Sequence, residues 1–334
     1  MHKEMIQPLR ADRAKTAGEA VYLKGDDHKM EKKSSIADGY NVLPYLAKIY
    51  QQLYLVPGEE SAKEYVKIVR SGKEAANKDL SHFRMDPSDS LTLEKTPAGE
   101  VRILTLHNRK DFEMFYTIVA HKCVPYQVPA SLGASLLDGM INWEKINRHE
   151  QEWVAEQKKA GNPCPDVDAE FQRFTSDKKN YLDALIVLSY GPYSNISAQA
   201  AGFAPEEWLS LSGSIRKYHE CTHFICRRLY REKIDPIWDE LVADAEGIYE
   251  TFGYTDVKLE ELFLGINENG YDKGRLENYV KPEDDIQVIA RTCHALLLKF
   301  EELSKNHERM EPYAFALLLE EKKEELQAMV SDIS

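Results

Sequence analysis

The sequence predicts an α+β fold that is predominantly α-helical, with a small sheet. Apolar residues recur at helical spacing over most of the chain after residue 36, whereas alternating β-branched stretches are few and short. A chain of 334 residues can bury a substantial core, as one large domain or two ordinary ones. We therefore expect helices to supply most of the core and the sheet to be a minor component.

The first half of the chain begins with a charged segment, residues 1–36, that has no sustained apolar period. We expect this segment to form a polar N-terminal arm. Residues 37–162 then combine helix-periodic stretches with a clear strand candidate, the alternating, β-branched residues 101–106. This region is expected to be an α+β region that lines a cleft or recognises a substrate.

The second half begins after a proline- and glycine-containing stretch at residues 161–165, which breaks regular structure and is the best boundary candidate. Residues 163–334 hold a strand candidate at 184–190, which could be an edge that binds an extended peptide or an ordinary buried strand. Ser212 or Ser214 is expected to cap the helix that follows. The expected helices are residues 43–55, 111–121, 143–159, a segment after 165 that ends near 181, the segment from 212 or 214 to 230, and residues 236–249, 284–303 and 311–330.

Composition narrows the classes of function. The chain has 56 acidic and 43 basic side chains, a net charge of −13, which argues against a nucleic-acid backbone as the main partner. No apolar run approaches the roughly 18–20 residues that span a bilayer, and the N-terminus has no apolar signal-peptide core. Five cysteines are few and odd in number, as in proteins of a reducing compartment. We expect a cytoplasmic protein that binds neither nucleic acid nor membrane; the sequence leaves its oligomeric state open.

The most informative motif is His219-Glu220-Cys221-Thr222-His223. On a helix, residues four apart lie on one face about 5–6 Å apart at Cβ, so both imidazoles can reach one metal ion. Glu220 leans toward the same side but stands off from the imidazoles, where a base for a metal-activated water belongs. The motif therefore predicts a catalytic zinc site with one ion per chain.

A second helix can supply a third ligand. Asp235-Pro236 is a typical helix start, because an N-cap acceptor is followed by proline at the first helical position. Glu240 then lies about one turn inside this helix, and Asp244 follows four residues later on the same face. If the helix packs back against the first one, Glu240 reaches the level of the histidines. Asp244 can then hydrogen-bond the free ring nitrogen of a liganding histidine.

These residues resemble the signature of the gluzincin branch of zinc metallopeptidases, the thermolysin-like proteins. In that family two histidines and a downstream glutamate bind zinc, the glutamate inside the first motif is the general base, and an aspartate steadies a histidine. The resemblance implies the zinc ligands His219, His223 and Glu240, the base Glu220 and the supporting carboxylate Asp244.

The resemblance covers about residues 214–250 and implies that the second half of the chain is zincin-like, with the active-site helix packed on the glutamate-bearing helix. Two features differ from the usual pattern. Arg216 and Lys217 occupy positions where an uncharged pair normally precedes the motif. The spacing of 17 residues from His223 to Glu240 is slightly short for the family.

The ligand set implies a hydrolytic mechanism. Three protein ligands leave zinc an open position for water, whose pKa falls toward about 7. Glu220 would take a proton from this water as it attacks a carbonyl, and pass the proton to the leaving amine. A further donor usually holds the developing oxyanion. Its candidates are His294 first, then Arg291, Tyr190 and Tyr193. The predicted function is a zinc metallopeptidase that acts on peptides or on a protein.

Other interpretations of the motif are open to test. A zincin-like domain can serve binding or regulation without turnover, and such a function would survive a glutamate-to-glutamine change at Glu220. Glu220-x-x-His223 is also half of a helical di-iron motif, but the chain has no second Glu-x-x-His. Cys221 and Cys226 flank the motif, and the position of Cys221 on the far side of the helix from His219 favours packing over metal binding.

Overall fold

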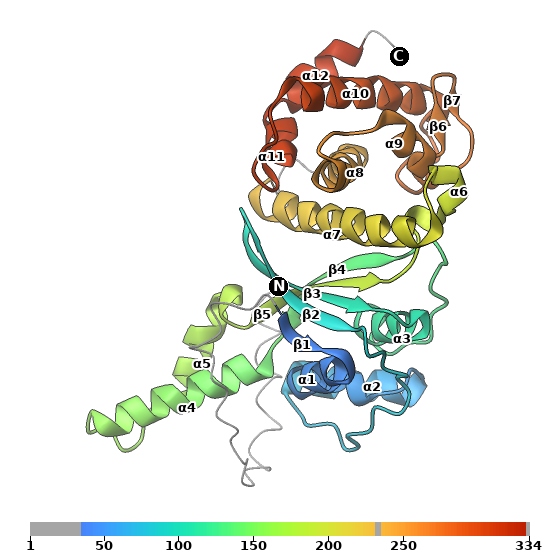
Figure 1. Ribbon diagram of the computed structural model, residues 1–334. Coiled ribbons are helices and arrows are strands. Elements are labelled where there is room, and N and C mark those ends of the chain that lie inside the picture. The colour runs from blue at the N-terminus through green and yellow to red at the C-terminus, as the bar shows by residue number, and fades with distance from the viewer. Residues whose placement is uncertain (1–34, 231–234, 332–334) are drawn as a thin grey trace. The chain divides into compact units, whose positions relative to one another are not determined.

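The computed structural model describes residues 35–230 and 235–331 (Figure 1). The expected N-terminal arm, residues 1–36, lies almost entirely outside the described residues. The described chain forms two compact units, each built from segments that are not contiguous in sequence. Unit 1 comprises residues 35–93, 104–128 and 137–185, and unit 2 comprises residues 94–103, 129–136 and 186–331.

Unit 1 contains five α-helices among the described residues, and three of them begin at a side-chain cap. These helices are α1 (Val42–Ile49), α2 (Glu59–Ser71), α3 (Arg109–Val119), α4 (Trp143–Lys159) and α5 (Val167–Ser176). The side chains of Asn108, Asn142 and Asp166 accept backbone N–H groups at the starts of α3, α4 and α5, which satisfies donors that a helix start leaves open. The predicted break at residues 161–165 separates α4 from α5 and lies inside unit 1.

The larger sheet has the strand order β1-β2-β3-β5-β4. Its strands are β1 (Ser35–Asp38), β2 (Ser90–Thr96), β3 (Gly99–Leu106), β4 (Ala134–Ile141) and β5 (Leu182–Ser189). Strand β1 pairs antiparallel with β2, with Ala37 opposite Leu91. The strands predicted at 101–106 and 184–190 are confirmed as parts of β3 and β5. Strand β5 lies between β3 and β4 and is buried over most of its length. Of the two alternatives left open by the sequence, β5 is therefore a buried strand and not an edge strand. Strand β4 stands at the end of the strand order.

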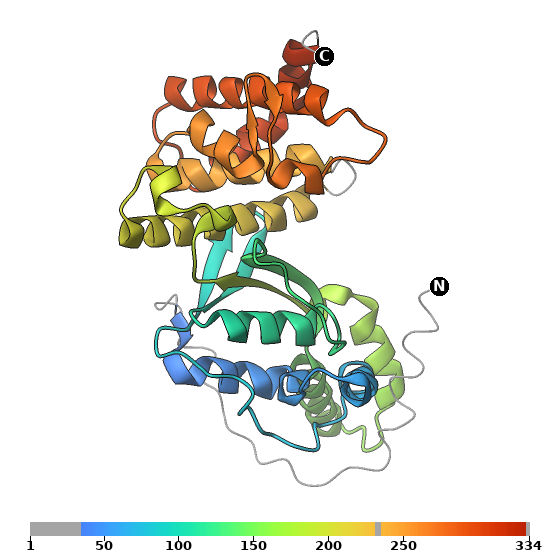
Figure 2. The ribbon, with the colours of Figure 1, turned by 90° about the vertical axis from the view of Figure 1, so that its right-hand side faces the viewer.

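Unit 2 is built around helix α8 (Pro236–Phe252). Figures 1 and 2 both show α8 between the long helices α7 (Pro205–Leu229) and α10 (Ile286–Asn306), which contact it. Shorter elements complete the unit: α6 (Ala198–Ala201), α9 (Val257–Leu264), β6 (Ile266–Asn267), β7 (Gly270–Tyr271), α11 (Ala314–Glu321) and α12 (Lys323–Val330). Trp238, Leu241 and Val242 of α8 join apolar side chains of α10, α11 and α12 in one buried core. The helix is therefore held on several sides by hydrophobic packing.

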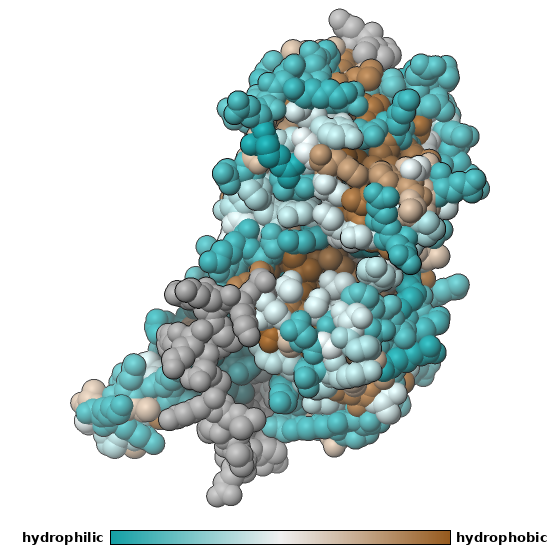
Figure 3. Space-filling model, viewed as in Figure 1, coloured by the Kyte–Doolittle hydropathy of each residue, from teal (hydrophilic) through white to brown (hydrophobic). Residues whose placement is uncertain are grey.

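Helices predominate and the sheet is small, which confirms the predicted mixed α and β class. Within the described residues, the helices are all too short or too polar to cross a membrane. Figure 3 shows hydrophilic side chains over most of one face of the protein, with smaller apolar areas between them.

Helices α7 and α8 approach each other closely at Gly247. A Cβ atom on this residue would lie 2.7 Å from the backbone carbonyl oxygen of Ile215 in α7. That separation is well inside van der Waals contact, and a backbone atom cannot move aside as a flexible side chain can. Glycine at position 247 thus sets the distance between the side chains that the two helices carry.

We predict that Gly247→Ala lowers the free energy of unfolding by about 1–3 kcal/mol, through overpacking against α7. At a helix position without such a contact, alanine is more favourable than glycine by about 1 kcal/mol. A lower free energy of unfolding for Gly247→Ala would therefore indicate the close contact with α7. Gly213→Ala in α7 is the matched control, because a Cβ there meets nothing within 4 Å and should stabilise the protein. Urea denaturation measures both changes, and equal stabilisation by the two variants would contradict the close approach.

Candidate metal centre

The first motif lies in the middle of α7, which begins earlier than predicted. Pro205 occupies the first turn and fixes a helical φ there, and Ala204 precedes it without a side-chain cap. Ser212 and Ser214 are therefore not N-caps, and that prediction was wrong. Both lie inside the helix, where the Ser212 hydroxyl accepts the backbone N–H of Tyr193 at 2.9 Å.

The start of α8 is confirmed. The Asp235 side chain accepts the backbone N–H groups of Ile237 at 3.0 Å and Trp238 at 3.4 Å, and Pro236 is the first helical residue. The predicted turn at residues 231–234 lies outside the described residues. Since α7 and α8 pack against each other along their length, Glu240 is carried back to the level of the histidines.

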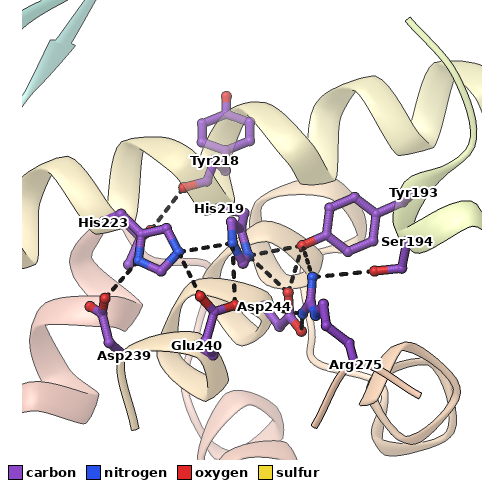
Figure 4. Close-up of polar contacts among 10 residues, drawn as sticks. Tyr193, Ser194, Tyr218, His219, His223, Asp239, Glu240, Asp244 and Arg275 are labelled. Carbon is purple, nitrogen blue, oxygen red and sulfur yellow. Dashed lines mark hydrogen bonds and ion pairs between the residues drawn. The ribbon is translucent and has the colours of Figure 1, made fainter. Parts of the chain in front are cut away.

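Three side chains converge at this point with their donor atoms facing one another (Figure 4). The Nε2 atoms of His219 and His223 are 3.0 Å apart. Glu240 places one carboxylate oxygen 3.3 Å from Nε2 of His223 and the other 3.7 Å from Nε2 of His219. Ligands about 2.0–2.1 Å from a tetrahedral zinc ion lie about 3.3 Å from one another. The separations therefore fit a donor set for one ion of that size, and these three residues form a group that could hold a metal.

The other ring nitrogen of each histidine faces a carboxylate. Nδ1 of His219 is 2.8 Å from Asp244, and Nδ1 of His223 is 2.8 Å from Asp239. An ionised carboxylate can only accept hydrogen bonds, so each Nδ1 carries the proton and each Nε2 presents a lone pair. Two ring nitrogens and a carboxylate then meet in a buried site, an arrangement that needs positive charge, which a proton or a metal cation can supply.

The electrostatics of the site show the same demand for positive charge. Burial acts to lower the pKa of His223, but Glu240 and Asp239 outweigh it and raise this pKa well above its usual value. Burial acts to raise the pKa of Glu240, but His223, His219 and Arg275 hold it far below its usual range. One oxygen of Glu240 is nevertheless buried without a hydrogen-bond partner among the described residues. A divalent cation would satisfy both rings and this oxygen together.

Asp244 is held from the opposite side by Arg275 and Tyr193. Arg275 Nη2 donates to Asp244, and Nη1 donates to the Tyr193 hydroxyl at 3.3 Å and to Ser194 at 3.2 Å. The Tyr193 hydroxyl lies 2.6 Å from Asp244 and 2.8 Å from Nδ1 of His219. Burial acts to raise the pKa of Asp244, but Arg275 and His219 outweigh it and lower this pKa. The ring of His219 is thus fixed by a network of three further side chains.

Glu220 opens onto the same cavity as the three converging residues. This cavity has a volume of about 230 Å³, and residues 131–136 form one of its walls. Its remaining lining comprises Tyr193, Ser194, Arg216, His219, Glu220, His223, Arg227, Glu240, Arg275 and Tyr279. The predicted base and the predicted ligands are therefore brought together. A larger, apolar cavity of about 280 Å³ beside Trp238 and Cys293 contains none of them.

A family model described as a family of unknown function, DUF7005, matches residues 28–329. The chain belongs to the DUF7005 family. No curated protein matches the chain. No solved structure matches it either.

The first candidate for an oxyanion donor is not in the cavity of this DUF7005 chain. His294, on α10, forms an ion pair with Glu261 of α9 at 2.6 Å instead, and its side chain is absent from the described cavity lining. Tyr190 is 41% exposed and likewise does not line the cavity. Tyr193 does line it, but its hydroxyl is bonded to His219 and Asp244. His294 thus has a local carboxylate partner, Glu261, and lies outside the lining of this cavity.

The cavity contains a tyrosine that the sequence did not single out. Tyr279 follows the short 3-10 turn that carries Arg275. Burial, with the carboxylates of Glu240 and Asp244, raises the pKa of Tyr279 well above its usual value against the effect of Arg275. Its hydroxyl is thus protonated, and it hydrogen-bonds the carboxylate of Glu240. Arg275 and Tyr279 lie far from both motifs in sequence, so no spacing connects them with the site. Asp239 could have been predicted as a partner of a histidine, because it directly precedes Glu240.

Cys221 packs as predicted. It is fully buried in α7, and burial raises the pKa of its thiol to about 12. Cys226 is also buried. Neither residue belongs to a group of possible metal ligands within the described chain.

A second group of possible ligands, Asp86, Asp89 and His107, lies in unit 1. Its carboxylates are occupied by backbone groups. Asp89 accepts the N–H groups of His107 at 2.8 Å and Asp86 at 3.0 Å, and Asp86 accepts that of Ser88 at 2.8 Å. These bonds fix the segments that flank β2 and β3, and they account for the cluster as loop structure.

We predict that Asp239→Ala weakens zinc affinity about 10- to 100-fold, because the ring of His223 loses the carboxylate that orients it. The affinity is measured by competition with a chelator of known zinc affinity. Glu261→Ala is the matched control, since it breaks a comparable carboxylate–histidine pair at His294, and it should leave zinc affinity unchanged. Equal affinities for Asp239→Ala and the unmodified protein would contradict the role of Asp239 in orienting His223 for metal binding.

Proposed function

We propose that this protein is a zinc-dependent metallopeptidase with a gluzincin-like centre. His219, His223 and Glu240 would hold one zinc ion per chain, and Glu220 would be the general base. The observation that carries the proposal is the convergence of two imidazole lone pairs and a buried carboxylate at separations of 3.0–3.7 Å. The opening of Glu220 onto the same cavity supports hydrolysis.

The chemistry follows from the side chains around the cavity. A bound zinc ion would act as a Lewis acid toward a substrate carbonyl and would lower the pKa of a water molecule at its open position. Glu220 accepts a proton from the attacking water as the new C–O bond forms. It returns this proton to the amine nitrogen as the C–N bond breaks. Asp239 and Asp244 keep His219 and His223 in the tautomer and orientation that binding requires.

Tyr279 takes the role first assigned to His294. Its hydroxyl is a neutral donor in the cavity, beside Glu240. Negative charge develops on the carbonyl oxygen during attack, and a donor held in place for it stabilises the transition state. Tyr193 would contribute indirectly, through its bonds to His219 and Asp244.

The sheet supports a peptide as the substrate. Residues 134–136 of β4 line the cavity, and β4 stands at the end of the strand order in the described sheet. An edge strand offers backbone N–H and C=O groups to which an extended peptide can add as a further strand. Such binding would place a backbone carbonyl of the peptide near the donor set.

We predict that Glu220→Gln abolishes hydrolysis, with a loss of about 10²–10⁴-fold in kcat because the base is removed, while the zinc content stays the same. Activity is measured on a library of internally quenched peptides. Glu207→Gln, an exposed position in the first turn of α7, is the control and should keep full activity. A zincin-like protein used for binding without turnover would instead show no hydrolysis in the unmodified chain.

We further predict that Tyr279→Phe lowers kcat about 10²–10³-fold with little change in KM, because the donor acts on the transition state. Zinc content and thermal midpoint should match those of the unmodified protein. Tyr190→Phe removes a hydroxyl outside the cavity and serves as the control. A kcat that is the same for both variants would exclude Tyr279 as the oxyanion donor.

A further inference from the structure

Arg216 is one of the two residues of α7 at which the chain departs from the gluzincin pattern, and the structure gives it a defined place. Its side chain is buried, with only 4% of the residue exposed, and it lines the same cavity as the converging histidines. It lies one helical turn before His219. A buried guanidinium is costly unless its donors are satisfied, so its partners indicate its role.

On one side, the guanidinium binds the turn that follows β5. Nη1 donates to the carbonyl oxygens of Ser189 at 2.8 Å and Gly191 at 3.0 Å, and Nη2 donates to that of Pro192 at 2.9 Å. A planar group with several donors can hold three carbonyls at once, which an ammonium group cannot do with the same geometry. Arg216 therefore fixes the path of the backbone into Tyr193.

On the other side, the guanidinium lies against Gly133. A Cβ atom at this position would be 2.8 Å from Nη2 and 2.9 Å from Nε of Arg216. Gly133 belongs to the wall formed by residues 131–136, and its carbonyl accepts the backbone N–H of Ser189 at 2.8 Å. The side chain thus joins two backbone segments, the wall and the turn, to the helix that carries the histidines.

Tyr193 connects this arrangement to the metal centre. It comes directly after the turn, its ring lies 5.7 Å from Arg216 Cζ, and its hydroxyl bonds to His219 and Asp244. A shift of the turn would move the cavity wall and this hydroxyl, whereas His223 and Glu240 are held by α7 and α8 themselves.

We propose that Arg216 is a positioning residue that ties the wall at residues 131–136 and the turn at residues 189–192 to α7, and so sets how a substrate backbone is held over the zinc centre. The inference rests on the proposed function, because it takes this cavity as the place where the substrate binds. It assigns to Arg216 the binding of extended substrates and leaves zinc binding to His219, His223 and Glu240.

Two hydroxamates test the proposal on the zinc-loaded full chain by calorimetry. Acetohydroxamate is small enough to contact the zinc centre alone, whereas a peptide hydroxamate also contacts the cavity wall. In Arg216→Met we expect one zinc ion per chain and an unchanged affinity for acetohydroxamate. The affinity for the peptide hydroxamate should fall about 10- to 100-fold, as for a misplacement of about 1 Å. Arg216→Lys should recover little of the loss, because an ammonium group cannot reach the three carbonyls with the geometry of the planar guanidinium.

Gly133→Ala disrupts the same contact from the side of the cavity wall. It tests the proposal if Arg216→Met does not fold. It should also weaken the peptide hydroxamate and spare acetohydroxamate. The effects of Gly133→Ala and Arg216→Met should be less than additive in the double variant, because both disrupt one contact. Arg228→Met is the control: Arg228 is exposed on the same helix, stacks over Phe224 at 4.3 Å and does not line the described cavity.

Unchanged affinity for the peptide hydroxamate in both folded variants would overturn the proposal. Equal losses for the two hydroxamates, or loss of zinc, would also overturn it, because Arg216 would then support the metal centre as a whole. If the unmodified chain binds neither zinc nor acetohydroxamate, the proposed function itself fails, and this inference fails with it. That outcome is seen in the unmodified protein and cannot be confused with an effect of the variants.

Discussion

The convergence of three electron-rich groups in a buried site is the interaction on which the rest of unit 2 depends. Asp239 and Asp244 face Nδ1 of His223 and His219, so the Nε2 atoms of both rings are turned toward Glu240. Helix packing holds these groups together. A divalent cation would therefore meet a preformed donor set, and its binding would add to folding stability.

Several features of the fold hold the donors in place. Gly247 lets α8 approach α7 closely enough for Glu240 to reach the histidines. Arg275 compensates the buried negative charge of Asp244, which also hydrogen-bonds His219 and Tyr193. The segment that carries Arg275 is itself fixed by Gly265, where a Cβ would lie 2.2 Å from the backbone of Lys273. Hydrophobic packing of α8 against α10 and α11 supports the whole arrangement.

The sequence predicted the parts of the site whose geometry is local. His219, Glu220 and His223 share one helix, so helical spacing alone places them, and the Asp235-Pro236 start fixes the level of Glu240 on the next. The fold class was predictable for the same reason, since periodicity reports helices and strands directly. The start of α7 was missed because Pro205 is a helix-start signal that competes with Ser212 and Ser214. Whether β5 is an edge strand or a buried strand depends on its neighbours in the sheet, so its own sequence could not decide it.

The remaining parts depend on tertiary structure. Tyr193, Arg275 and Tyr279 come from segments whose spacing from the motif carries no geometric information, and the turn and hairpin that deliver them form only in the folded chain. Arg216 was visible in the sequence as a departure from the family pattern, but its three carbonyl partners were not. The ion pair between His294 and Glu261 was likewise not visible in the sequence, which offered His294 as a candidate oxyanion donor.

We propose that His219, His223 and Glu240 share one metal ion. The most direct measurement is the zinc content per chain of the purified protein, determined by mass spectrometry alongside His223→Ala. We expect about one zinc ion per chain, lost in the variant although it remains folded. A folded, unmodified protein without tightly bound zinc after exposure to the metal, or a variant that retains it, would show that these residues do not share a metal ion.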